Sequence, residues 1–137
     1  MISLDKKLNK ALWHINASFE LFCRLSNQFA KIEINEINNI PFEMFSKIKG
    51  SYTRAKKLFL EGRKCFNNVY YSSKDSFASI NIINNKYFER SIVYLMDANN
   101  AFMRVKGNIQ NKTIMMDIIS ELNILIMQLK SVASLLR

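Results

Sequence analysis

The residues that could bind a ligand are basic, and they concentrate between Pro41 and Ser72. This segment holds seven lysines and arginines against Glu43 and Glu61, so it carries +5 of the chain's net charge of +9. A helical row of cations can contact successive phosphates, and each such contact releases counterions. The candidate nucleic-acid-binding residues are therefore Lys47, Lys49, Arg54, Lys56, Lys57, Arg63 and Lys64.

At 100° per residue these cations form two rows along one helix. Lys49, Lys56 and Arg63 lie on one flank of its apolar stripe. The opposite flank and the back carry the other four, Lys47, Arg54, Lys57 and Lys64. Both rows are expected to face solvent and to extend for about 25 Å. The alternatives are a plain solvated helix face and a lysine excess inherited from an Asn-, Ile- and Lys-rich composition.

No side-chain pattern indicates an enzyme or a metal site. His14 is the only histidine, and Cys23 and Cys65 are the only cysteines, so no zinc site of usual composition can be assembled. An RNase-like centre on His14 lacks the arginine upstream on the same helix. Asp117 and Glu121 are one turn apart, but the Glu-x-x-His motif of di-metal bundles is missing. We expect no catalytic residue, no metal and no cofactor.

The apolar pattern that must position these residues is helical. The chain has 137 residues with three glycines and one proline, too few for the turns of a β-sheet fold. Lys31–Ile40 is expected to be a connection, and whether the third helix continues through Asn84 is left open. We predict an all-α fold, an antiparallel up-down-up-down four-helix bundle, as a single domain over residues 1–137 with helices at 3–30, 41–71, 75–106 and 111–136.

The fourth helix is apolar over more than one face. Its core stripe runs from Ile114 to Leu136 at helical spacing, but further apolar residues lie outside that stripe. Such a helix is central to the bundle or contacts another subunit. The expected oligomer-interface residues are Met116, Ile124, Met127 and Leu135.

Nothing in the sequence indicates a membrane protein. The most apolar run, Ile114–Met127, is interrupted by polar residues and is expected to be too short to cross a bilayer. The first residues lack the pattern of a signal peptide. We therefore expect a cytoplasmic protein with no membrane partner.

The four-helix pattern, the Ile40-Pro41 step and the basic second helix resemble one known family. It is the four-helix-bundle family of accessory variability (Avd) proteins of diversity-generating retroelements, which includes proteins encoded in intervening sequences of bacterial large-subunit rRNA genes. The similarity covers about residues 4–136. Ile40-Pro41 replaces the usual Phe-Pro step. Only Glu121 is kept from the family's Glu-Ile-Gly-Arg/Lys run, and no Gly-Gly-Trp follows.

The resemblance implies a pentameric homo-oligomer whose basic surface binds template RNA and a partner reverse transcriptase. Two functions then stand side by side. The first is a non-catalytic accessory protein that binds nucleic acid, structured RNA rather than DNA, with little base specificity. The second is a protein-interaction module, such as a small subunit of a CRISPR or other defence complex or an anti-defence protein, whose basic face meets an acidic protein surface.

Overall fold

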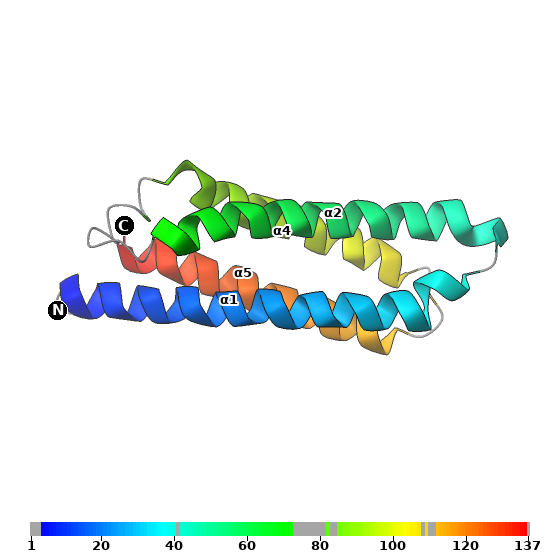
Figure 1. Cartoon of the computed structure of the whole chain (residues 1–137), viewed down its shortest axis with the longest axis horizontal. Coiled ribbons are helices and arrows are strands. Elements are labelled where there is room, and N and C mark those ends of the chain that lie inside the picture. Colours follow the sequence, from blue (N-terminus) through cyan, green and yellow to red (C-terminus); the bar gives the residue numbers. More distant parts are fainter. Residues whose placement is uncertain are drawn as a thin grey trace.

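The helices alternate in direction along the chain. The computed structural model describes residues 4–40, 42–72, 82, 85–107, 109 and 112–136. Its elements are α1 (Leu4–Asn35), the short 3-10 helix η1 (Ile37–Asn39), α2 (Phe42–Ser72), α4 (Lys86–Lys106) and α5 (Thr113–Leu136). Each long helix runs opposite to the one before it (Figure 1), and neighbours contact in the order α1, α2, α4, α5 and back to α1. The predicted all-α four-helix bundle is confirmed.

The closest approaches are between α2 and α4 and between α1 and α5. Gly62 of α2 shows how the close approach of α2 and α4 arises. A Cβ atom at this position would lie 3.0 Å from Leu95 Cδ2 and 3.3 Å from Tyr94 Cβ, both on α4. Because Leu95 is fully buried, it has little room to move away. The absence of a side chain at Gly62 therefore sets the distance between α2 and α4.

Large aromatic side chains fill the space between the α2–α4 pair and the α1–α5 pair. The Phe22 ring of α1 lies 5.4 Å from Phe59 and 4.7 Å from Phe66, both on α2. The Phe29 ring lies 4.8 Å from Phe59 and 5.4 Å from Phe102 of α4. Each of these rings is at most 2% exposed. Their bulk explains why α1 and α2 approach less closely than the helices within each pair.

The first helix is longer than the sequence pattern predicts. The expected connection at Lys31–Ile40 is wrong for its first half, because α1 continues to Asn35. Ile32 is fully buried and extends the core stripe at helical spacing, whereas Ile34 is 67% exposed. The Ile-Glu-Ile alternation by itself is typical of an extended segment. Burial of Ile32 against the core nevertheless keeps these residues helical.

The third predicted helix is broken at its weak point. Asn85 has an extended backbone, with φ −76° and ψ 116°, and its Oδ1 accepts a hydrogen bond from Tyr87 N at 2.8 Å. It is thus the N-cap of α4, which begins at Lys86. The helix expected over 75–106, whose continuity near Asn84 the sequence leaves open, is interrupted at Asn85. Residues 75–81 of that prediction lie outside the described residues.

The last helix buries a broader face than predicted. Met115, Ile119 and Ile126 of α5 join the expected stripe in the core. With 24 residues, α5 is the one helix in the described part of the chain that is long and apolar enough to cross a membrane. The apolar run Ile114–Met127 is thus part of a longer helix, whose length does not by itself exclude a membrane span. A central helix of a bundle passes the same test, and α5 packs on α1 and α4.

Candidate nucleic-acid interface

The seven candidate cations of α2 lie in two different environments. One group is solvent exposed, and none of its members is ion-paired with another described residue. This group, named here the outer row, consists of Lys47, Arg54, Lys57 and Lys64. It extends for about 25 Å along α2. These ammonium and guanidinium groups are free to meet an external anion.

The remaining cations turn toward α1. Lys56 Nζ donates to Glu33 Oε1 at 2.7 Å, and Arg63 Nη1 donates to Ser26 Oγ at 2.7 Å. Both cations are half-buried, so the expectation that this flank faces solvent is not met. Lys49 is also half-buried and interacts within the protein. Lys49, Lys56 and Arg63 are named here the inner row, of which Lys56 and Arg63 bridge the wide seam between α1 and α2.

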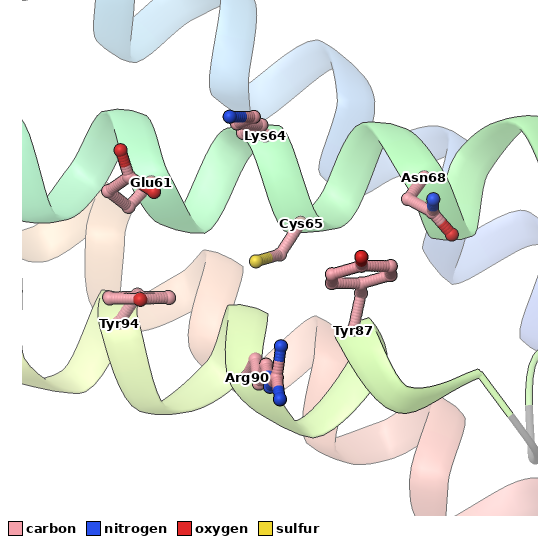
Figure 2. A pocket seen from close by; sticks show the side chains of 7 residues that line it. All are labelled: Glu61, Lys64, Cys65, Asn68, Tyr87, Arg90 and Tyr94. Carbon is pink, nitrogen blue, oxygen red and sulfur yellow. The ribbon is translucent and has the colours of Figure 1, made fainter.

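A pocket of about 280 Å³ opens between α2 and α4. Figure 2 shows Tyr87 and Tyr94 rising from α4 toward α2, with the Cys65 sulfur pointing into the space between the helices. The lining combines two cations, two phenol rings, a carboxylate, an amide and a thiol. Its residues are Glu61, Lys64, Cys65 and Asn68 of α2 and Tyr87, Arg90 and Tyr94 of α4.

Asn85 holds one end of this pocket in place. Its Nδ2 donates to Asn68 Oδ1 at 2.7 Å and so ties the start of α4 to α2. Arg90 Cζ lies 5.7 Å from the centroid of the Tyr87 ring, and Lys86 Nζ lies 5.2 Å from the same centroid. Both cations are within cation–π range of this ring. The Tyr87 ring therefore sits in a positive environment.

The Cys65 thiol at the pocket is a poor nucleophile at neutral pH. Burial raises the pKa of Cys65, and the Glu61 carboxylate raises it further, while Arg90 and Lys64 act in the opposite direction. The thiol therefore stays protonated at neutral pH, where only a thiolate would react readily. Neither Lys64 nor Arg90 is ion-paired with Glu61 or another described carboxylate. With two cations and one carboxylate, the pocket carries a formal charge of +1.

The residues considered for catalysis are not brought together. His14 Nδ1 donates to Gln128 Oε1 of α5, and the His14 ring meets the Trp13 ring edge-on with centroids 5.0 Å apart. Glu121 Oε1 lies 3.9 Å from Arg24 Nη1. Among the described residues, no three His, Cys, Asp or Glu side chains come close enough to hold a metal ion.

The apolar residues predicted as an oligomer interface are mostly at the surface. Met116, Ile124 and Met127 are 55%, 48% and 67% exposed, whereas Leu135 is half-buried against the core. Further large apolar side chains are exposed on α1 and α4, namely Trp13, Val93, Met96 and Met103.

The α4 side of the pocket was not predicted from the sequence. The apolar pattern assigns Tyr87 to the core stripe and gives Arg90 and Tyr94 no role. Their spacing of i, i+3 and i+7 places all three on one face of a helix, which is a signal the sequence does contain. What the sequence pattern does not show is that this face of α4 packs beside Lys64 of α2.

Comparisons with protein families, with curated proteins and with solved structures find no match to this chain. The family resemblance is therefore an expectation from the sequence, and function must be argued from the surface itself.

Proposed function

We propose that this protein is a non-catalytic basic accessory module that binds the phosphate backbone of nucleic acid, RNA rather than DNA, in the cytoplasm. The observation that supports this most is the outer row, four exposed cations without an ion-pair partner among the described residues. A row along one helix suits a linear polyanion, and phosphate contacts of this kind carry little sequence information. The inner row stabilises the fold and contributes less to binding.

The salt dependence of binding to a fluorescently labelled hairpin RNA tests this proposal. Four phosphate contacts give a slope of log affinity against log salt of about −3 to −4. The double variant Arg54→Glu with Lys57→Glu should weaken binding and make that slope smaller by about 1.5 to 2, because two contacts are lost.

The matched control is Lys31→Glu with Lys130→Glu, which changes net charge equally at exposed positions of α1 and α5. It should affect binding much less. Equal weakening by the two double variants would show that only total charge matters, and affinity independent of salt would exclude phosphate binding. Copurification of one acidic protein in stoichiometric amount, without nucleic acid, would favour the alternative of a protein-interaction module.

Self-association through the outer face of α5 is the second part of the proposal. Met116, Ile124 and Met127 expose apolar surface there. Copies that each carry +9 repel one another, so a largely uncharged face is where they can meet. Because α2 and α5 occupy opposite corners of the bundle, this association leaves the outer row facing outward.

Light scattering measures this association directly. Ile124→Lys with Met127→Lys should reduce the mass toward that of one chain, whereas Leu60→Lys, at a 47% exposed apolar position of α2, should not. A mass of one chain for the unaltered protein would contradict self-association. The pentamer and the partner reverse transcriptase implied by the family resemblance are tested by that mass and by copurification.

A further inference from the structure

We propose that the pocket between α2 and α4 holds one unstacked nucleotide of a single-stranded segment, with its phosphate at Lys64 and Arg90 and its base against Tyr87. This inference rests on the proposed function and names the form of nucleic acid that the surface selects. A continuous duplex keeps its bases stacked and paired, so it can use the outer row but not the pocket.

The position of the pocket fits the path of a bound strand. Lys64 belongs both to the outer row and to the pocket lining, so a backbone that follows the row reaches the pocket at its end. Arg90 stands across from it on α4 (Figure 2). A guanidinium can bind phosphate oxygens with two parallel hydrogen bonds. A phosphate between these two cations would be held from both helices.

The rings and the size of the pocket fit a base. Every base has a π face, and stacking on aromatic side chains is a common, sequence-tolerant way to bind single strands. Tyr87 and Tyr94 are both half-buried and both line the pocket. Its volume of about 280 Å³ lies below the roughly 300–1,000 Å³ of drug-sized ligand sites. The space therefore suits a group no larger than one nucleotide.

The two cations lie in the middle of the pocket, with Tyr87 on one side of them and Tyr94 with Glu61 on the other (Figure 2). Lys64 and Arg90 supply positive charge. The Glu61 carboxylate accepts hydrogen bonds, which suits a ribose hydroxyl or a base amino group and disfavours a phosphate close to it. The protonated thiol of Cys65 leaves the adjoining surface neutral. A bare phosphate would use only the cations, whereas a nucleotide would use the whole lining.

Alkylation of the two cysteines tests occupancy of the pocket. Cys65 lines the pocket, and Cys23 lies on α1 beside Arg63, so each protein molecule carries its own control. The reaction with iodoacetamide is run at about pH 9, where more of the Cys65 thiol is deprotonated than at neutral pH, and is followed by mass spectrometry. Uridine monophosphate should slow the reaction of Cys65 and leave that of Cys23 unchanged. Inorganic phosphate at the same ionic strength should protect Cys65 less. Equal protection by the two compounds, or none by either, would contradict a nucleotide site.

Binding of a single-stranded oligouridylate and of a blunt-ended duplex RNA without an unpaired loop then separates this proposal from the first. Tyr87→Leu should weaken binding of the single strand by about five- to a hundredfold and leave duplex binding unchanged. Tyr71→Leu, at a 71% exposed tyrosine outside the pocket, is the matched control and should affect neither. Circular dichroism establishes that each variant is folded.

If Tyr87→Leu fails to fold, Arg90→Gln at an exposed position replaces it and should also weaken the single strand selectively. If the folded variant binds the single strand as tightly as the unaltered protein does, the nucleotide site is overturned. Binding of phosphates by the outer row is not affected by that result. Loss of salt-dependent binding to both RNAs in the unaltered protein overturns the proposed function instead.

Discussion

The α2–α4 pair and the α1–α5 pair share one aromatic core but differ at their surfaces. The α2–α4 pair carries the outer row of free cations and a polar pocket between its helices. Both pairs expose large apolar side chains, such as Trp13, Ile124 and Met127 in the α1–α5 pair and Val93, Met96 and Met103 on α4. Because α2 and α5 occupy opposite corners, the outer row and the exposed apolar side chains of α5 point in opposite directions. Binding of a polyanion and association of copies therefore need not compete for one face.

The largest effect is expected where the two pairs meet. Phe59 of α2 contacts Phe22 and Phe29 of α1, so Phe59→Ala should lower the free energy of unfolding by about 3–5 kcal/mol. Urea denaturation measures this, and Leu60→Ala at the neighbouring exposed position should cost about 0.5 kcal/mol or less. Trp13 fluorescence reports on α1 and circular dichroism on all helices. Separate transitions by these probes would show that the pairs unfold independently.

A smaller effect distinguishes the close seam within one pair. Gly62→Ala places a Cβ 3.0 Å from Leu95 and should destabilise the protein by about 1–3 kcal/mol, since the buried leucine cannot yield. Gly50→Ala meets no atom within 4 Å and should stabilise α2 by up to about 1 kcal/mol. Thermal unfolding of both variants measures the contrast. Stabilisation by both would mean that the seam between α2 and α4 can widen freely.

The two rows of α2 should respond differently to neutralisation. Lys56→Ala breaks the pair with Glu33 and should cost up to about 1 kcal/mol, less at high salt, because the pair is partly exposed. Lys57→Ala should leave stability unchanged but weaken RNA binding. Parallel melting and binding measurements decide this. The reverse pattern would mean that the inner row is the ligand-binding one.

The smallest expected effect is a loss of stability at alkaline pH that comes from Cys65. Burial beside Glu61 raises the pKa of Cys65 in the folded protein. The folded protein therefore holds the Cys65 thiol proton more tightly than the unfolded chain does, which adds to the free energy of unfolding. This addition is fully present below the thiol's pKa in the unfolded chain, about 8.5, and is lost as pH rises above that value. The urea midpoint should fall between about pH 8 and pH 10, and Cys65→Ala should reduce the slope of this fall. Cys23→Ala is the control, and a slope that Cys65→Ala leaves unchanged would contradict this account.

Much of the fold follows from apolar spacing. The exceptions are places where contacts between helices decide the structure. Ile48, Phe59 and Phe66 are buried as their spacing predicts, because periodicity decides which face of a helix is apolar. Apolar periodicity does not predict where α1 ends or where α4 begins. Burial of Ile32 and the hydrogen bond from Asn85 to Asn68 of α2 depend on where neighbouring helices lie. About half of the candidate site follows as well, since the cations of α2 are found by composition and spacing.

By itself the sequence determined that this protein forms helices, which faces they bury, and that its positive charge concentrates on α2, since all three depend on residues close together in the chain. Only the tertiary structure decided which basic row is free, because Glu33 and Ser26 of α1 bind Lys56 and Arg63 from far along the sequence. It also placed the α4 tyrosines and Arg90 beside Lys64. Helix pairing is set by steric fit at contacts such as Gly62 against Leu95, which periodicity within one helix does not specify.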